Sequence, residues 1–404
     1  MNWKIVLALL VSFALLMSSS YTMLIPFLPI YLDKELGASR ESLSMWSGLV
    51  FAISFAISAF AAPLWGKLSD KMGKKPMIIR SSVLIAITYF LAGIVTTPFE
   101  LFLVRAFQGV AAGLWPACLV MLSAYAPKKK LGFAMGLMQS ANITGSILGP
   151  LLGGILATSF GMRNSFFIGA AALSLISITT ILFIKEPPKQ ENTDPVNQKA
   201  PGYLSLLKDK NLLILLFVVG FTNFVIMQIQ PIVALYVEKL NQSSHDVMIL
   251  SGLVLSLGGF AGAIAAPIWG KAGQKHGFYK TLTLSLIVAG SLIAMQGLPN
   301  VLWLFALMQF VCGLAFSGIF PSANSILVLF TPSNIRGTGF GLLFSAQMVG
   351  GAIGPIIGGF LVTFLSFNSV YFASGSVLVV LGLYLITLAP KTFKQRANAN
   401  STNN

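Results

Sequence analysis

Residues 63–67 read PLWGK, and residues 267–271 read PIWGK, at an offset of 204 positions (267 − 63 = 204). Three further blocks match at nearly the same offset. Residues 47–50 match 251–254. Gly149-Pro150 and Gly153-Gly154 match Gly354-Pro355 and Gly358-Gly359. Pro26 and Tyr31 match Pro231 and Tyr236. Four blocks aligned in this way indicate a duplicated chain. Two parallel repeats around a central pathway are a common plan of membrane transporters.

The composition predicts an all-α integral membrane protein. Of 404 residues, 56% are hydrophobic and 9% are charged, whereas a soluble domain carries about 25% charged residues. A membrane-spanning helix needs about 20 apolar residues. Twelve such spans are predicted, at 5–32, 44–66, 77–96, 99–124, 131–158, 163–184, 211–237, 248–270, 279–297, 300–328, 337–364 and 368–389. The first is too long for the apolar core of a signal peptide.

One polar, proline-rich stretch, residues 185–210, interrupts this pattern near the middle of the chain. It is the natural place for a linker between the repeats. The predicted domains are an N-terminal six-helix bundle at 1–184, a cytoplasmic linker at 185–210, a C-terminal six-helix bundle at 211–389 and a cytoplasmic tail at 390–404.

We interpret the net charge of +15 as a sign of how the chain is oriented in the membrane. Most Lys and Arg residues lie in the termini and in alternate loops, as the positive-inside rule requires, so both termini are expected in the cytoplasm. We therefore expect membrane lipid, and not nucleic acid, around this chain. Cys118, Cys312, His245 and His276 lack metal or disulfide spacing, so no metal is expected. The nucleotide-binding pattern GxxxxGK[ST] does not occur, so we expect no cofactor and an ion gradient as the energy source.

Three motifs carry a family resemblance. They are residues 66–75, GKLSDKMGKK, residues 103–109, LVRAFQG, and residues 145–154, GSILGPLLGG. With the repeat, they resemble the major facilitator superfamily over nearly the whole chain. Within it, the chain is most similar to the drug:proton antiporter family with twelve spans, the bacterial multidrug efflux type. The resemblance implies two pseudo-symmetric six-helix bundles and a proton gradient as the energy source.

The first motif is similar to the superfamily signature GxLaDrxGrK. Its glycines permit a tight turn, and its acid can favour the positive N-terminal end of a helix. The resemblance implies a conformational latch against a helix of the other half. The latch residues would be Gly66, Asp70, Gly73, Lys74 and Lys75. The alternative is a basic loop that sets topology. In the second copy Gln274 replaces the aspartate, so we expect that copy to keep the turn and lose the charge latch.

The second motif resembles LxxRxxqG and places Arg105 inside an apolar helix. A charge at the bilayer centre costs at least about 3 kcal/mol, so the side chain should face a cavity or a partner. In the family this arginine is associated with proton coupling; the alternative is an arginine that snorkels to the headgroups. Asp33 and its repeat mate Glu238 are the other proton-coupling candidates. The alternative for both is an interfacial acid at a solvated helix end.

The third motif matches GxxxGPxxGG, which is associated with antiporters in this superfamily. Its residues are Gly145, Gly149, Pro150, Gly153 and Gly154. Small residues let helices approach closely, and proline introduces a bend. The alternative is ordinary small-residue packing. The motif favours export over uptake.

The first, fourth, seventh and tenth helices should line a substrate cavity, with polar groups added by the fifth and eleventh. Aromatic and methionine side chains adapt to varied apolar ligands, which suits a lipophilic or cationic drug. The candidates are Tyr21, Met23, Phe27, Tyr31, Trp115, Gln139, Asn142, Phe224, Met227, Gln228, Phe316, Phe320, Asn324 and Gln347.

These features predict a secondary active transporter, not an enzyme. We expect a monomer of the bacterial inner or plasma membrane that exports lipophilic or cationic drugs, with small-molecule substrates and protons as its partners. An exporter of a native metabolite or sugar with the same fold is the alternative. A membrane enzyme or receptor is a more remote one, because an intramembrane enzyme needs clustered His, Asp or Ser at matched depths.

Overall fold

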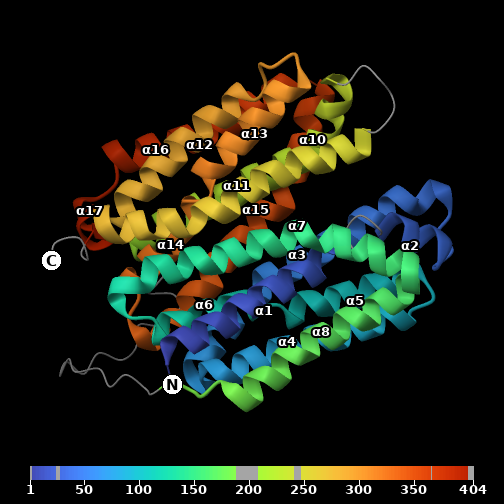
Figure 1. Cartoon of the computed structure of the whole chain (residues 1–404), viewed down its shortest axis with the longest axis horizontal. Helices are drawn as coiled ribbons and strands as arrows, with labels where there is room; N and C mark the ends of the chain where they lie inside the picture. Colours follow the sequence, from blue (N-terminus) through green and yellow to red (C-terminus); the bar gives the residue numbers. More distant parts are fainter. Residues whose placement is uncertain (1, 24–27, 188–207, 241–246, 365, 399–404) are drawn as a thin grey trace. The chain divides into compact units, whose positions relative to one another are not determined.

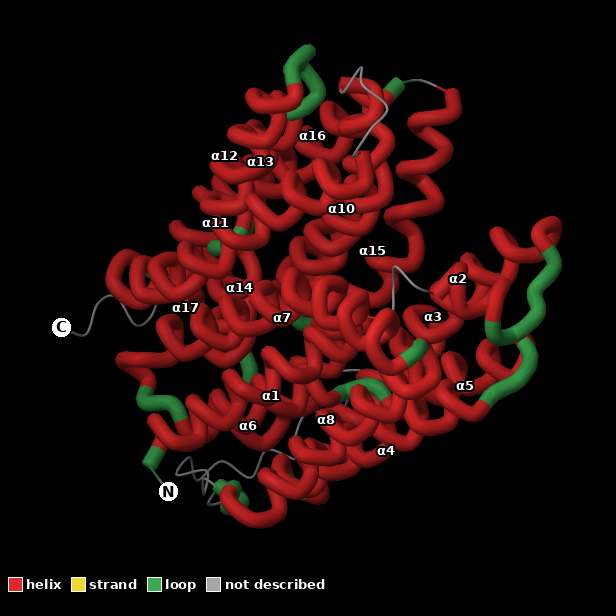
Figure 2. The backbone as a smooth tube through the Cα atoms, turned by 45° about the vertical axis from the view of Figure 1, so that its right-hand side comes forward, coloured by secondary structure: helices red, strands yellow, loops and turns green. Residues whose placement is uncertain are grey.

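The computed structural model describes the chain except for residues 1, 24–27, 188–207, 241–246, 365 and 399–404. The described part is built from helices and contains no strand. Twelve spans in it are long and apolar enough to cross a membrane, which confirms the predicted number. Figure 2 shows the described helices in red and the described loops between them in green.

The described residues of the first half form eight helices and one short 3-10 turn (Figure 1). They are α1 (Trp3–Met23), α2 (Leu28–Lys34), α3 (Arg40–Met72), α4 (Lys74–Ile94), α5 (Pro98–Ala111), α6 (Leu114–Tyr125), η1 (Lys128–Lys130), α7 (Leu131–Phe160) and α8 (Met162–Phe183). The predicted first span, 5–32, covers α1 and most of α2. The residues that join these two helices, 24–27, lie outside the described part.

The second half follows the same order, except that the single helix α10 corresponds to α1 and α2, and it adds a short helix at the end. Its elements are α10 (Lys210–Leu240), α11 (Val247–His276), α12 (Phe278–Met295), α13 (Leu302–Phe316), α14 (Ile319–Phe330), η2 (Ser333–Ile335), α15 (Arg336–Phe364), α16 (Phe367–Thr387) and α17 (Lys391–Asn398). Helix α17 occupies part of the predicted tail at 390–404 and was not predicted.

Two predicted spans are broken helices. The span predicted at 99–124 consists of α5 and α6, which are separated at Ala112 and Gly113. Gly113 has φ +120°, a conformation that a residue with a Cβ adopts only under strain. The span predicted at 300–328 consists of α13 and α14, which are separated at Ser317 and Gly318, where the backbone keeps right-handed helical angles. Hydropathy cannot detect such breaks, because the apolar composition continues across them.

The turns also differ from the prediction. Helix α3 continues through Gly66 to Met72, and the reversal occurs at Gly73, whose φ is +104°. Helix α11 likewise continues through Gly270 to His276, before Gly277 with φ +100°. The predicted ends at 66 and 270 mark where apolar residues stop. The helices run on because charged residues are compatible with a helix that leaves the bilayer.

The described chain packs as two compact units. Unit 1 comprises Met1–Tyr125, Ala141–Tyr203 and Ser333–Ser345, and unit 2 comprises Ala126–Ser140, Leu204–Pro332 and Ala346–Asn404. In unit 1, α4 packs along α8 and α3 along α5; in unit 2, α12 packs along α16 and α11 along α13. Helix α7 begins in unit 2 and continues in unit 1, and α15 begins in unit 1 and continues in unit 2. The predicted domain boundaries follow the sequence repeat and stay a prediction.

Candidate functional site

The Asp70 carboxylate in unit 1 caps the first turn of α15. Its Oδ1 accepts a hydrogen bond from the Gly337 N–H at 2.7 Å. Its Oδ2 accepts from the Thr338 N–H at 2.7 Å and from the Thr338 hydroxyl at 2.6 Å. The first N–H groups of a helix have no partner within the helix, and the helix dipole favours an anion at this position. Asp70 therefore holds the beginning of α15 through three bonds.

Small residues bring α3 and α15 into backbone contact here. A Cβ at Gly66 would collide with the Gly337 carbonyl, and a Cβ at Gly341 would lie 2.6 Å from the Ala62 carbonyl oxygen. Gly66 therefore serves close helix packing and not the predicted turn. Gly66 lies one turn before Asp70, so this close packing lets the Asp70 carboxylate reach the first turn of α15.

The remaining residues of this motif contact a different partner, Glu186. The Glu186 carboxylate accepts hydrogen bonds from the Lys74 N–H and the Lys75 N–H, both at 2.7 Å. The Lys75 ammonium donates to the Ile181 carbonyl at 2.9 Å. Glu186 therefore caps α4 directly after the turn at Gly73. Sequence reasoning missed Glu186, although it is an acid just after the sixth predicted span.

The second copy of the motif makes an uncharged version of the Asp70 contact, within unit 2. The Gln274 Oε1 accepts a hydrogen bond from the Gly132 N–H, near the start of α7, at 3.0 Å. A Cβ at Gly270 would collide with the Gly132 carbonyl. Gly132 and Gly337 are repeat mates (337 − 132 = 205). The negative charge is lost in this copy, as expected, but the contact persists through one neutral bond.

Arg105 is buried inside unit 1, with 8% of its surface exposed. Its Nη1 donates to the Gln108 Oε1 at 2.8 Å, one turn further along α5. The phenol groups of Tyr21 and Tyr89 lie within electrostatic range of the guanidinium. No carboxylate in the described residues forms an ion pair with it. The guanidinium is thus surrounded by neutral polar groups and is not extended to the surface.

Of the candidate acids, Asp33 has a described side chain, and it forms no ion pair with Arg105. Asp33 is exposed at the end of α2. The backbone of Glu238 belongs to α10, and its side chain lies outside the described part. Glu35, which the sequence analysis did not select, pairs with Arg163 at 2.9 Å. Arg163 also donates to carbonyls at the end of α4, so this pair fastens α2, α4 and α8 together.

The glycines of the third motif lie on the face of α7 that contacts α1. A Cβ at Gly145 would lie 2.6 Å from the Leu15 carbonyl oxygen. At Gly149 and Gly153 a Cβ would collide with the Thr22 side chain and the Met23 carbonyl. Pro150 lies within the helix and Gly154 is half-buried beside this row. The repeat mates Gly350, Gly354 and Gly358 place α15 on α10 in the same way.

Among the cavity candidates of unit 1, Tyr21 has 36% of its surface exposed and Met23 is buried. Trp115 and Asn142 are half-buried. Tyr31 is buried, donates its hydroxyl to the Ala92 carbonyl at 2.7 Å, and packs 5.0 Å from the Phe166 ring. Tyr31 therefore packs helices together in this structure and presents no free surface to a ligand. Phe27 lies outside the described residues.

The cavity candidates of unit 2 are partly buried. Gln139, Gln228 and Asn324 are buried, whereas Phe224, Met227, Phe316, Phe320 and Gln347 are half-buried. The Phe316 and Phe320 rings lie 6.5 Å apart. The Gln228 Oε1 and the Asn324 Oδ1 are buried oxygens without a hydrogen-bond partner in the described chain. An unpaired buried polar atom is costly, so these two oxygens are suited to accept a bond from a ligand or water.

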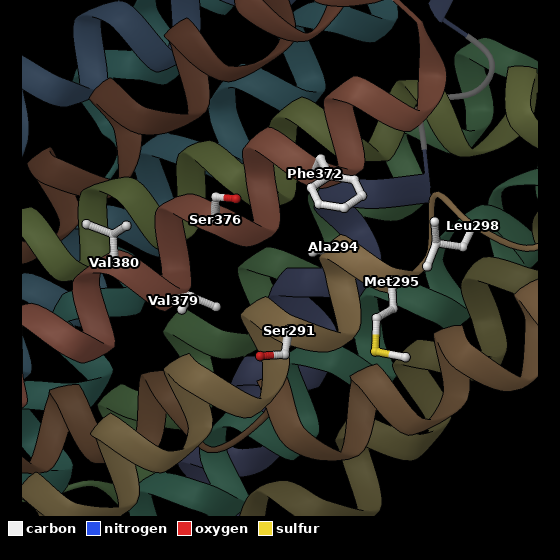
Figure 3. Close-up of a pocket in the computed structure, with 8 residues that line it drawn as sticks. All are labelled: Ser291, Ala294, Met295, Leu298, Phe372, Ser376, Val379 and Val380. Carbon is white, nitrogen blue, oxygen red and sulfur yellow. The ribbon is translucent and has the colours of Figure 1, made fainter.

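A groove of about 390 Å³ between α12 and α16 is lined by apolar side chains (Figure 3). Its lining residues are Ser291, Ala294, Met295, Leu298, Phe372, Ser376, Val379 and Val380. None of the predicted substrate residues lies in it. Both helices are membrane spans, and exposed side chains such as Phe372 and Val380 suit contact with lipid tails.

The sequence model of the Major Facilitator Superfamily matches residues 10–262 and 231–403. The chain belongs to the Major Facilitator Superfamily. It is 33% identical to the multidrug resistance protein MdtG of Proteus mirabilis over 93% of this chain and 94% of that protein. It is 32% identical to MdtG of Salmonella arizonae over 95% of each chain.

The crystal structure of the human organic anion transporter MFSD10 (TETRAN) has the same fold, with a TM-score of 0.79. It is 16% identical, and the match covers 95% of this chain and 100% of that chain. These findings confirm the predicted fold class and superfamily. The chain is a multi-pass transporter of small molecules in the cell membrane, and not an enzyme.

Proposed function

We propose that this superfamily member exports lipophilic or cationic drugs from a bacterial cell in exchange for protons, by alternating access. The similarity to proteins named multidrug resistance protein MdtG, over 93% or more of the chain, carries this proposal. The glycine rows of α7 and α15 support it, because they follow the motif associated with antiporters. We propose a monomer with both termini in the cytoplasm, where Lys4 and Lys391 would lie.

Asp70 is proposed as one side of a reversible latch. The contact joins α3 of the first sequence repeat to α15 of the second. It depends on charge-assisted hydrogen bonds at a partly buried helix end, which can form and break without unfolding either helix. The neutral bond of Gln274 would form a second and weaker contact.

Arg105 is proposed as the fixed charge in proton coupling. A buried cation without a described carboxylate partner is sensitive to any proton gained or lost nearby, because charges interact strongly in an apolar interior. The Gln108 amide holds the guanidinium in place. Asp33 and Glu238 are the proposed proton carriers, which titrate while Arg105 stays charged.

The substrate surface is proposed to combine aromatic and methionine side chains with a few polar groups. Tyr21, Trp115, Phe224, Met227 and Phe316 would contact the apolar part of a drug. The unpartnered oxygens of Gln228 and Asn324 would accept hydrogen bonds from its amino groups. A cationic ring system offers both kinds of contact.

Transport of ethidium into inverted vesicles tests this function. We expect uptake that requires a proton gradient and stops with an uncoupler. Arg105→Gln should abolish the gradient-dependent part, and neutral replacement of the proton carrier, Asp33 or Glu238, should do the same. Lys34→Gln, which removes an exposed charge, should behave as the parent. Gradient-independent flux, or no flux of any cationic dye, would refute the proposal and favour export of a native metabolite.

A further inference from the structure

Helix α17 packs across the ends of the membrane spans at one end of unit 2. The Thr392 hydroxyl donates to the Asn211 Oδ1, in the first turn of α10, at 3.3 Å. The Phe393 ring lies 5.1 Å from Phe330 at the end of α14 and 6.2 Å from Tyr279 at the start of α12. Successive spans alternate in direction. The start of α10, the start of α12 and the end of α14 therefore belong to the same side of the membrane.

The short helix has an apolar face and a basic face. Phe393 and Ala397 are completely buried against unit 2, whereas Lys391 and Gln395 are exposed. The Lys394 ammonium donates to the Ile386 carbonyl, in the last turn of α16, at 2.6 Å. A cation at this position complements the negative end of the α16 dipole. The helix is therefore anchored by side chains, with charge left on its outer face.

The surrounding surface, which we call the basic end, carries many exposed cations. It consists of Lys208, Lys210, Lys271, Lys275, His276, Lys280 and Lys391. Asp209 is the acid among the neighbouring described residues, and its Oδ1 accepts from the Asn211 N–H at 2.9 Å. In the described part of the chain no ion pair with a carboxylate involves a member of the basic end. Six exposed lysines and one histidine beside this single described acid give the basic end an excess of positive groups, which favours an external anion.

Apolar side chains mark the bilayer boundary directly beside α17. Leu388 has 72% of its surface exposed and Ile386 has 47%. Both precede α17 at the end of the span α16. Side chains of this kind are suited to the hydrocarbon region, and the cations that follow them then lie at headgroup level. An anion held by the basic end would thus be next to lipid tails.

We propose that the basic end, with α17 lying in its plane, binds the headgroups of anionic phospholipids. The apolar face of α17 attaches it to the protein, and its exposed lysine faces the lipid phosphate. Lysines near an anionic membrane surface each add about fivefold to binding. Lys280 and Lys391 flank the contact between Tyr279 and Phe393 and are expected to share one headgroup.

Thermal unfolding of the purified full-length chain, titrated with phosphatidylglycerol or phosphatidylcholine, tests this inference. We expect stabilisation by phosphatidylglycerol alone. In the double variant K280Q/K391Q the half-saturating concentration should rise roughly 30-fold, from two factors of about five. The matched control K34Q/K239Q removes two exposed lysines elsewhere and should shift it by less than about threefold.

Two further measurements keep the inference open to refutation if the variant folds poorly. Binding of phosphatidylglycerol to the parent chain should weaken in 0.5 M salt, because surface electrostatics are screened. The variant K280R/K391R should bind as the parent does. Equal stabilisation by phosphatidylcholine, or equal shifts in K280Q/K391Q and in the control, would overturn the proposal. Equal stabilisation by inorganic phosphate, or binding of an acidic polypeptide in place of lipid, would also overturn it.

Discussion

Replacing Asp70 by asparagine should release the first turn of α15. Asparagine has one acceptor oxygen and one donor amide group, so at least one of the three bonds to Gly337 and Thr338 is lost. A bond to a charged group is worth about 1.5–3 kcal/mol, and the charge at a helix N-terminus adds about 0.3–1 kcal/mol. Because Asp70 is only half-buried, we expect the contact to lose about 2 kcal/mol. This corresponds to a roughly 30-fold shift of the equilibrium between the bound and the released first turn of α15.

Hydrogen exchange measured by mass spectrometry over residues 333–345 reads this equilibrium directly. The N–H groups of Gly337 and Thr338 are the donors to Asp70, so their exchange should accelerate by roughly 30-fold in Asp70→Asn. Glu100→Gln is the control, since Glu100 is an exposed acid outside the proposed latch and the proposed proton carriers, and it should leave these amides unchanged. Exchange within about threefold of the parent in a folded Asp70→Asn protein would refute the latch.

Three other changes test the packing and the electrostatics. Gly149→Ala places a Cβ 2.7 Å from a carbonyl of α1 and should lower stability by about 1–3 kcal/mol in thermal unfolding; Gly48→Ala, with nothing within 4 Å, should not. Gln274→Ala should accelerate exchange at the start of α7 by only about fivefold, because a neutral bond is lost; a 30-fold change would show that charge is unimportant at Asp70. Glu35→Gln breaks a pair whose side chains are each 34% exposed, so it should cost less than about 1 kcal/mol in thermal unfolding, and this cost should shrink in 0.5 M salt because an exposed pair is screened.

The sequence predicted the number of spans and the superfamily because both depend on local composition and spacing. It could not predict where helices end outside the bilayer, since α3 continues for six residues after Gly66 (72 − 66 = 6) through charged positions. It also missed the break at Gly113, where only the backbone conformation changes. Helix α17 was missed because eight residues are too few for a periodic signal.

The sequence identified those residues of the candidate site that belong to a recognisable motif. In the structure Asp70 caps α15 and the glycines of α7 pack closely against α1. Their functional roles stay predictions. Partners distant in sequence were invisible, as with Glu186 for the turn at Gly73 and Gly132 for Gln274. Tyr31 was chosen for its chemistry, and its burial depends on Phe166, which is 135 positions away (166 − 31 = 135).

Because α7 and α15 each begin in one packing unit and continue in the other, neither half of the sequence encodes a complete unit. A fragment ending at residue 187 lacks the segment Ser333–Ser345 that completes unit 1, and a fragment starting at residue 208 lacks Ala126–Ser140 of unit 2. Each fragment alone would leave the residues that pack against that segment without their partners. Expressed together, the two fragments should complete each other's packing, because each supplies the segment that the other unit lacks.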